Sequence, residues 1–206
     1  LPVPEAPKLR ASDSPFAINW MGAPVGRTYD IERATSAKGP WTVVGHDVSD
    51  GVNEWDPAKM DLFRDDYRSL QLGKTYYYRV IAKNESGASS PSNVISIKHS
   101  QKNLAPQITL SEALTTTVDK GVQLHGAWKD DNLPDRQVKT GWSNGGNKNV
   151  HFCDADKDDT RAWFSAPGDY VLTFTADDGL LKSSKKLNVS VKDAAGKIPA
   201  DYCNFG

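Results

Sequence analysis

The chain has 206 residues, of which 38% are hydrophobic and 25% charged, and its net charge is −1. This length suits two domains of about 100 residues, and the composition predicts a folded rather than a disordered chain. A nearly neutral chain has no basic field to attract nucleic acid, and no apolar run approaches the about 20 residues of a membrane span.

The sequence begins at Leu1, with neither a methionine nor a signal peptide, so we expect a processed product or a piece of a longer protein. Its two cysteines, Cys153 and Cys203, are too few and too far apart for a metal site. Asn84 and Asn188 begin N-x-Ser sequons and are candidate glycosylation sites. A cysteine pair without catalytic neighbours fits an oxidising compartment, so we expect a secreted, extracellular protein.

Alternating apolar and polar residues predict strands early in the chain. Residues 16–20 (FAINW) and 29–33 (YDIER) both have the period of two that is typical of a half-buried strand. A turn at 38–40 (KGP) precedes a third predicted strand at 41–44 (WTVV). No stretch has a sustained helical period, and the charged segment 56–70 leaves open a short helical turn or a long loop.

Three consecutive tyrosines, residues 76–78, begin the clearest predicted strand. Because alternate side chains of a strand face opposite sides, one face takes Tyr76, Tyr78, Val80 and Ala82. The other face takes Tyr77, Arg79, Ile81 and Lys83. The first set is the apolar one, so we expect Tyr76 and Tyr78 to be buried and Tyr77 to be at least partly exposed. This interpretation leaves one ring of the three for a binding surface.

The flanks of this strand resemble the fibronectin type III family. The shared pattern is a leucine, a glycine turn, a corner tyrosine, an alternating strand ending in Ala-x-Asn, then glycine and serine, found here at Leu70, Gly73, Tyr76, Val80, Ala82, Asn84, Gly87 and Ser89. The early core tryptophan and the first strand of the family correspond to Trp20, Pro4, Pro7 and Leu9.

The resemblance covers residues 4–98 and implies a β-sandwich with a corner tyrosine bonded to nearby backbone. The chain departs from the family at Leu72, where proline is common, and in a long insertion at residues 53–68. It has no Arg-Gly-Asp motif, so integrin binding is not implied. We therefore expect a fibronectin type III-like module over 1–99 and, after the polar stretch KHSQKNLAP, a linker over 100–105.

The second half predicts more strands. Residues 122–125 (VQLH) alternate, 129–135 (KDDNLPD) form an acidic loop, and 140–143 lead into a hairpin-type turn at 144–146 (NGG). The stretch 164–179 then places four apolar residues on one face, Tyr170, Leu172, Phe174 and Ala176. A last strand carries Leu187, Val189 and Val191.

This half resembles the PKD and Ig-like repeats of secreted multidomain proteins. The shared features are Trp-Ser at 142–143, Phe-Ser-x-Pro-Gly-x-Tyr-x-Leu at 164–172 and Ala-x-Asp-Gly at 176–179. The Trp-x-Phe-Gly-Asp-Gly run of the PKD form is missing at Trp142. The resemblance implies a second sandwich over 106–192, so the fold class is all-β, with two tandem antiparallel β-sandwiches.

The tail, residues 193–206, has little apolar content and should fray unless it is tied down. We expect Cys203 to be bonded to Cys153, which closes a loop of about 50 residues and contributes roughly 4 kcal/mol by the chain-entropy relation. Two free thiols are the alternative.

The sequence carries no motif of a nucleophile elbow, phosphate loop, zinc protease or dinucleotide site. Four histidines, at 46, 99, 125 and 151, have no metal-binding spacing and are expected on the surface or on strand faces. Paired carboxylates for glycoside hydrolysis need a cleft, which small sandwiches offer rarely. We therefore expect no catalytic residues and no cofactor.

Two acidic runs are candidates for calcium. The run Asp154-x-Asp156-x-Asp158-Asp159 resembles the start of an EF-hand loop, but it has no glycine at the sixth position and no later glutamate, so an EF-hand is rejected. A second candidate site comprises Asp130, Asp131 and Asp135. A solvated acidic loop is the alternative for this second cluster.

Six tryptophans are candidates for sugar contacts, because exposed rings stack on the apolar faces of sugars. Two of them are assigned to the cores, Trp20 and Trp142, and Trp128 is left unassigned. The carbohydrate-contact candidates are Trp41, Trp55 and Trp163. Packing remains the alternative for each, because large aromatic residues dominate burial.

Such pairs of modules resemble the appended regions of secreted carbohydrate-active enzymes. The resemblance implies a non-catalytic spacer or accessory function beside a polysaccharide-degrading domain, with that domain or a polysaccharide as partner. One alternative is an extracellular adhesion or structural protein that binds another protein. The other is a carbohydrate-binding module that uses exposed tryptophans. We expect no nucleic acid partner and no membrane insertion.

Overall fold

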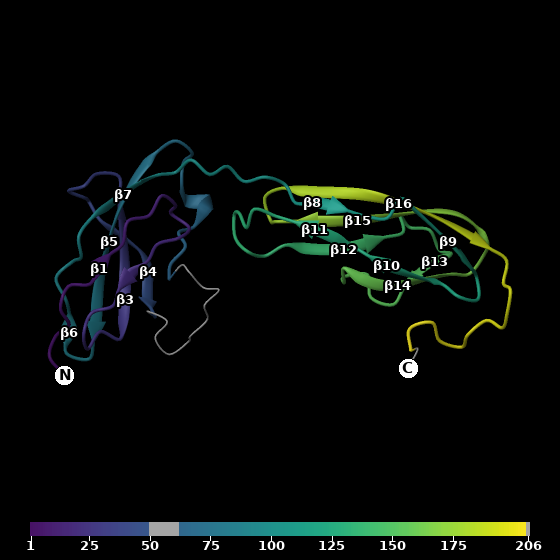
Figure 1. The fold of residues 1–206 in the computed structure, drawn as a ribbon, viewed down its shortest axis with the longest axis horizontal. Coiled ribbons are helices and arrows are strands. Elements are labelled where there is room, and N and C mark those ends of the chain that lie inside the picture. The colour runs from purple at the N-terminus through teal and green to yellow at the C-terminus, as the bar shows by residue number, and fades with distance from the viewer. Residues whose placement is uncertain (50–61, 205–206) are drawn as a thin grey trace. The chain divides into compact units, whose positions relative to one another are not determined.

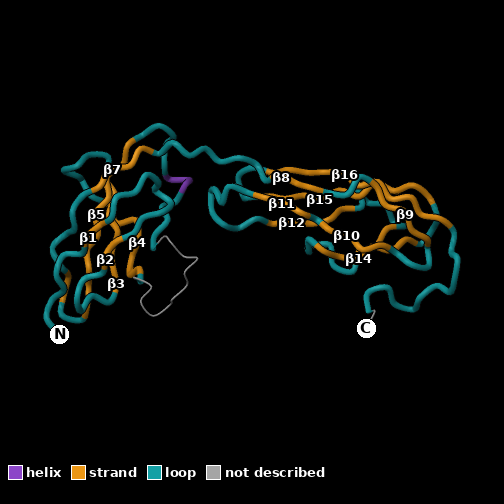
Figure 2. Tube along the Cα trace, in the orientation of Figure 1, coloured by secondary structure: helices purple, strands orange, loops and turns teal. Residues whose placement is uncertain are grey.

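The structure, a computed structural model, describes residues 1–49 and 62–204. The chain divides into two compact units, Leu1–Lys102 and Asn103–Gly206 (Figure 1), and the division falls inside the segment 100–105. The described residues form strands and loops with one short 3-10 helix (Figure 2), so the protein is all-β. In these ranges no helix has the length and apolar character needed to cross a membrane.

The first unit contains two sheets. The smaller one pairs β1 (Lys8–Leu9) with β2 (Trp20–Met21) antiparallel. The larger one has the order β4–β3–β5–β6 with β7 also paired to β5, and its strands are β3 (Thr28–Ala34), β4 (Thr42–Val48), β5 (Thr75–Asn84), β6 (Gly87–Ala88) and β7 (Ile95–Lys98). The 3-10 helix η1 (Tyr67–Ser69) precedes β5.

The alternation of β5 has the predicted register. Tyr76, Tyr78, Val80 and Ala82 are buried, whereas Tyr77 is partly exposed. The buried side chains pack against residues of the other strands, which include Leu9, Ile18, Trp20, Tyr29 and Ile31. The core of the first unit therefore lies between the β1–β2 side and the inner face of the larger sheet.

The predicted strand at 16–20 is shorter than expected. Only its end is regular, in β2, and Ile18 forms a single bridge with Phe63. The chain turns at residues 15–17, which interrupts the strand. The alternation still holds, because Phe16, Ile18 and Trp20 are all buried.

His99 departs from the expectation that each histidine lies at the surface or on a strand face, because it is buried just beyond the end of a strand. Its side chain follows β7, is 1% exposed, and contacts the rings of Phe16 and Tyr67 edge-on at centroid distances of 5.5 and 5.4 Å. The backbone of His99 exchanges hydrogen bonds with the loop before β5, through the carbonyl of Lys74 and the N–H of Gly73. An unpatterned histidine gave no sign of this burial, because its neighbours come from distant segments.

The second unit contains three sheets. One has the order β12–β15–β16–β9, another β10–β14–β13, and the third pairs β11 with β8. The strands are β8 (Gln107–Thr109), β9 (Ala113–Thr117), β10 (Val122–His125), β11 (Ala127–Lys129), β12 (Lys139–Ser143), β13 (Val150–Phe152), β14 (Asp159–Phe164), β15 (Gly168–Asp177) and β16 (Lys182–Lys192).

One strand pair is parallel, which corrects the expectation of a wholly antiparallel sandwich. β9 runs beside β16 in the same direction, with Ala113 opposite Asn188. The remaining strand pairs of the described chain are antiparallel. Apolar alternation reports which face a side chain takes but not the direction of the neighbouring strand, so the sequence did not reveal this pairing.

The expected hairpin at 144–146 is also wrong. β12 ends at Ser143 and pairs with β15, whereas β13 begins at Val150 and pairs with β14. The NGG turn therefore carries the chain from one sheet to another. Between the sheets lies a core that contains Trp142, Phe174 and the expected apolar residues of β15 and β16, namely Tyr170, Leu172, Leu187, Val189 and Val191.

Candidate functional site

Two tyrosine hydroxyls bond back to nearby backbone and shape the loops around them. Tyr76, at the start of β5, accepts a hydrogen bond at 2.9 Å from the N–H of Gln71. In the second unit Tyr170 donates to the carbonyl of Ala166 at 2.7 Å. The first is the corner contact that the fibronectin resemblance implies, and it fixes the loop of residues 71–74 over the end of the first sandwich.

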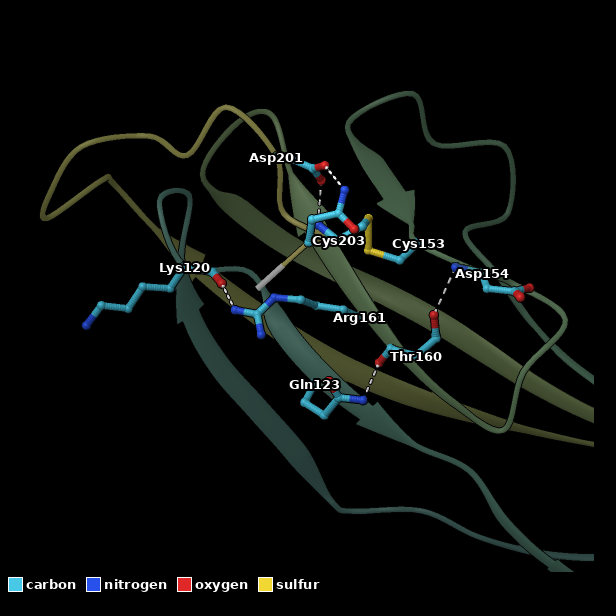
Figure 3. The surroundings of a disulfide bond; sticks show 9 residues. Lys120, Gln123, Cys153, Asp154, Thr160, Arg161, Asp201 and Cys203 are labelled. Atoms are coloured by element: carbon cyan, nitrogen blue, oxygen red, sulfur yellow. Dashed lines mark hydrogen bonds between the residues drawn. A yellow bond between two sulfur atoms is a disulfide. The ribbon is translucent and has the colours of Figure 1, made fainter. Parts of the chain in front are cut away.

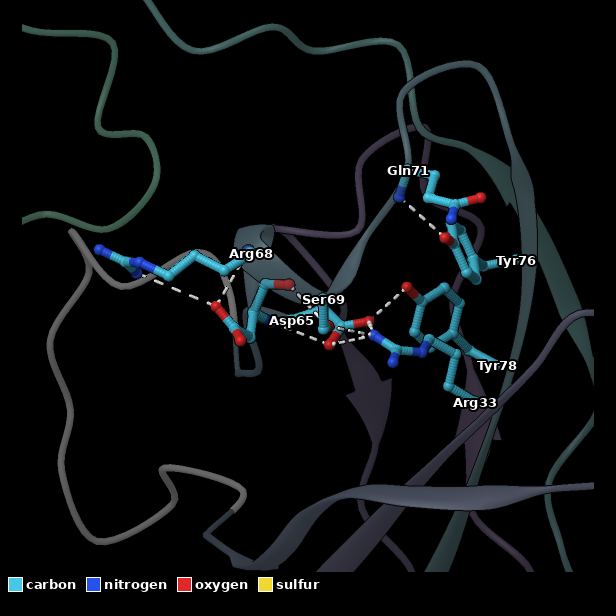
Figure 4. A network of polar contacts seen from close by, with 8 residues as sticks. Arg33, Asp65, Arg68, Ser69, Gln71, Tyr76 and Tyr78 are labelled. Carbon is cyan, nitrogen blue, oxygen red and sulfur yellow. Dashed lines mark hydrogen bonds and ion pairs between the residues drawn. The ribbon is translucent and has the colours of Figure 1, made fainter. Parts of the chain in front are cut away.

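A buried carboxylate, Asp65, lies close to η1 and faces Arg33 and Tyr78 (Figure 4). Arg33 Nη1 donates to both of its oxygens at 2.9 and 2.8 Å, and the Tyr78 hydroxyl donates to Oδ2 at 2.6 Å. The N–H of Asp66 adds a bond of 2.8 Å to Oδ1. Because the buried charge has these four donor contacts, its desolvation is largely compensated. The network ties the segment before η1 to strands β3 and β5.

Electrostatics keep Tyr78 protonated in this network. Burial raises the pKa of its phenol, and the neighbouring Asp65 carboxylate raises it further. The hydroxyl therefore remains a donor to Asp65 throughout the ordinary pH range. This sequence position was assigned to the core, and its polar function was missed, because the partner lies 13 residues away in a segment without a regular pattern.

Beside the network the surface is hollowed into a polar pocket of about 350 Å³. The guanidinium of Arg33 and the Lys74 ammonium approach the Tyr76 ring, at 5.4 and 5.8 Å from its centroid. The polar side chains of the lining are Arg33, Thr35, Thr42, Ser69, Gln71 and Lys74. We call this group the Arg33–Lys74 pocket.

Trp41, a candidate for sugar contact, is partly covered. The guanidinium carbon of Arg79 lies 4.4 Å from its ring centroid, and Arg79 is itself held by an ion pair with Glu32. The ring is half-buried beside the outer face of the larger sheet. One face of Trp41 is therefore occupied by a cation–π contact and is not a bare platform. Trp55, the second candidate, lies outside the described residues.

The C-terminal tail is tied to the second unit by the disulfide between Cys153 and Cys203 (Figure 3). Tyr202, beside it, is buried and donates its hydroxyl to the carbonyl of Val118 at 2.6 Å. Farther up the tail, the N–H of Ala195 donates to Asp119 at 3.0 Å. The tail is thus held by a covalent bond, a buried ring and a backbone contact.

Trp163, the third sugar candidate, is part of a stack of three rings. His151 lies 3.9 Å from its centroid at 17°, and Tyr202 lies 4.9 Å away at 3°. Two rings this close to one centroid would overlap if they shared a face, so Trp163 is enclosed on both sides. The structure therefore does not support Trp163 as a sugar platform; it anchors the tail instead.

The calcium candidates Asp130, Asp131 and Asp135 are used in local turns. Each accepts a hydrogen bond from a backbone N–H two residues later, and Asp131 also accepts from the N–H of Leu104 at 2.9 Å. Over residues 1–49 and 62–204, no three His, Cys, Asp or Glu side chains come together as a metal site would require. At these positions the structure has an acidic loop whose carboxylates accept hydrogen bonds from backbone N–H groups.

The acidic run at residues 154–159 contains a structural residue that sequence reasoning missed. Asp158 accepts a hydrogen bond from Trp128 Nε1 through Oδ2, and one from Trp142 Nε1 through its carbonyl, both at 3.0 Å. Thr140 donates to its other carboxylate oxygen. Asp158 therefore joins the β13–β14 turn to β11 and β12. Its place in an acidic run gave no sign of this, because the partners come from other strands.

The two sequon asparagines differ in their surroundings. Asn84 Nδ2 donates to the carbonyls of Pro2 and Val25, at 2.7 and 3.1 Å, and its Oδ1 accepts from the Ser86 N–H. Asn188 is exposed in β16, between Ala113 and Val171 of the neighbouring strands. A glycan on Asn84 would replace one of the two hydrogen bonds that Nδ2 donates, whereas the side chain of Asn188 is exposed.

The remaining histidines form no catalytic group. His46 and His125 are exposed and each lies near one aspartate, Asp30 and Asp159. His151 belongs to the stack around Trp163. Within the described residues, Asp65 and Asp158 each bond to several donors and hold loops and strands together.

Comparison with known proteins gives partial similarities. No protein-family model matches the chain. A titin homolog from Caenorhabditis elegans is 31% identical over 133 residues, which are 57% of this chain and 1% of the relative. The chain thus spans a very small part of this curated relative.

Among solved structures, the solution structure of the PKD domain from KIAA 1837 protein is 23% identical and covers 48% of this chain and 96% of its own, with a TM-score of 0.36. The FN1–FN3 domains of chicken CNTN1 are 15% identical and cover 95% of this chain and 70% of their own, with a TM-score of 0.34.

Proposed function

We propose that this chain is a pair of non-catalytic accessory modules of a secreted multidomain protein, a polysaccharide-degrading enzyme, in which they space a catalytic domain from its surroundings. The observation that carries the proposal is that the carboxylates with well-defined partners bond to groups of their own sandwich. The carboxylates with the best-defined partners, Asp65 and Asp158, are both bonded to fixed donors within their sandwiches. Neither has a free position from which to activate water or a substrate.

The organisation of the chain also favours spacing. Each unit has its own buried core, and the tail of the second is closed by a disulfide. The residues beside the division are anchored to their own units, His99 to the loop of Gly73 and Leu104 to Asp131. The disulfide supports the proposed secretion, because such bonds persist in oxidising compartments.

A structural function in an adhesive or filamentous protein is the second candidate. The similarity to a titin homolog favours it, because the matched 133 residues exceed one unit of this chain. Under this proposal the partner is another protein, and catalysis is again absent. The carbohydrate-binding candidate is less favoured, because Trp41 and Trp163 both have rings covered by other side chains.

The test uses the purified chain in two assays. We expect no hydrolysis of cellulose, chitin, mannan or xylan, and no co-sedimentation with these insoluble polysaccharides. Hydrolysis that is lost on a point substitution within the chain would refute the accessory function. Co-sedimentation that is lost in Trp41→Ala, but not in the Tyr77→Ala control, would favour the carbohydrate-binding module.

A further inference from the structure

The Arg33–Lys74 pocket has an excess of positive charge. Its lining contains two cations and no carboxylate. Asp65 lies behind Arg33 and pairs with Nη1 only. The described residues include no ion-pair partner for Lys74, which is exposed at the rim. After Asp65 is counted, the pocket therefore keeps about one positive charge, that of Lys74.

The pocket also has unused hydrogen-bonding groups. Arg33 is held in place by Asp65 and Ser69 through Nη1, which leaves Nε and Nη2 without a bonded partner among the described residues. The side chains of Thr35, Thr42 and Gln71 have no bonded partner in the same part of the chain and line the same hollow. A guanidinium fixed by a buried carboxylate is a preorganised donor, which lowers the entropy lost on binding.

We propose that the Arg33–Lys74 pocket binds a sugar that carries a carboxylate, a uronate. The planar guanidinium edge of Arg33 matches a carboxylate, and the Lys74 ammonium supplies the second charge. The hydroxyls of Thr35 and Thr42 and the amide of Gln71 offer both donors and acceptors, which suit the hydroxyl groups of a sugar ring. The pocket volume of about 350 Å³ is near the lower end of the range for small-ligand pockets. The pocket therefore has room for one sugar unit.

The chemistry of the pocket disfavours other ligands. The Tyr76 ring is buried, so a neutral sugar has no aromatic face on which to stack. A phosphate accepts hydrogen bonds from the cations and from the hydroxyl and amide donors, but it has no donor for the acceptor oxygens of Thr35, Thr42 and Gln71. This inference goes beyond the spacing function and does not depend on it, because the pocket belongs to the first unit alone.

The experiment titrates the full ¹⁵N-labelled chain with D-galacturonate and records backbone amide shifts. We expect saturable shifts at residues 33–35, 42 and 69–76, and none with D-galactose at the same concentration. Lys74→Gln should weaken binding about tenfold, which is the effect of losing one charge-assisted hydrogen bond. The matched control, Lys8→Gln on β1, removes an exposed lysine outside the pocket and should bind like the native chain.

Several outcomes would overturn the proposal. They are equal responses to galactose and galacturonate, equal binding of inorganic phosphate, shifts that map away from the pocket, and a Lys74→Gln chain that binds normally. If trigalacturonate binds as well as the monosaccharide, the ligand is a uronate unit within a polysaccharide. If the trimer does not bind, the ligand is a free uronate. Failure to bind galacturonate would leave the absence of hydrolysis, and thus the spacing function, unchanged.

Discussion

Asp158 and His99 show that the hydrogen bonds and the burial of a single residue depend on its neighbours in the fold. Asp158 belongs to an acidic run, yet it accepts bonds from two tryptophan side chains of other strands. His99 is a titratable residue enclosed by Phe16 and Tyr67, with no hydrogen-bond partner for either ring nitrogen among the described residues. Burial lowers the pKa of His99, and the charge of Asp65 opposes this only in part.

This histidine predicts a pH dependence of the first unit. The unfolded chain binds a proton near the ordinary histidine pKa of about 6.5, and the folded chain does so only at lower pH. The contribution of neutral His99 to stability is therefore present above about pH 6.5 and is lost as the pH falls below it. Urea unfolding of the native chain and of His99→Leu, between about pH 7 and pH 5, measures this contribution.

The His99→Leu chain should lose less stability over this interval than the native chain. A matched control is His46→Gln, which changes an exposed histidine and leaves His99 in place. Identical pH slopes for all three chains would show that His99 does not titrate differently in the folded state.

At the scale of elements, strand β5 shows that the period of two decides which tyrosines are buried. We expect Tyr76→Ala to lower the free energy of unfolding by about 3–5 kcal/mol, since it removes a large core ring and the bond to the Gln71 N–H. Tyr77→Ala should cost less than about 1 kcal/mol, since that ring is on the outer face. Denaturant unfolding of both variants measures the difference, and equal costs would contradict the register.

The tail is a second element with its own prediction. The bridged cysteines are 50 positions apart in the sequence, so Cys203→Ser should lower the free energy of unfolding by up to about 4 kcal/mol. Tyr202 remains as an anchor, because its ring is buried against Trp163. Unfolding followed by tryptophan fluorescence measures the loss. Cys153→Ser breaks the same bond and should behave alike; a large difference between the two variants would mean that the loss does not come from the bridge.

The whole molecule consists of two units with separate cores. Because each unit has its own buried cluster over the described residues, we expect fragments 1–102 and 103–206 to fold alone. Amide hydrogen exchange of the fragments and of the full chain provides the comparison. Loss of protected core amides in either fragment would show that the units depend on each other.

The sequence by itself determined the all-β class and the buried faces of β5, β15 and β16. These features depend on local alternation and on turn residues, which act over a few neighbouring positions. The cysteine pair also led to the correct bridge, because a chain with two cysteines allows only one pairing.

Only the tertiary structure decided the functions of single polar and aromatic residues. Arg33 and Lys74 line one pocket, Asp65 bonds to Arg33, and Trp163 lies between His151 and Tyr202, although these groups are distant in sequence. The direction of β9 was likewise decided by its pairing with β16. The physical reason is that burial, charge compensation and ring stacking depend on which segments become neighbours, and a local pattern does not contain that information.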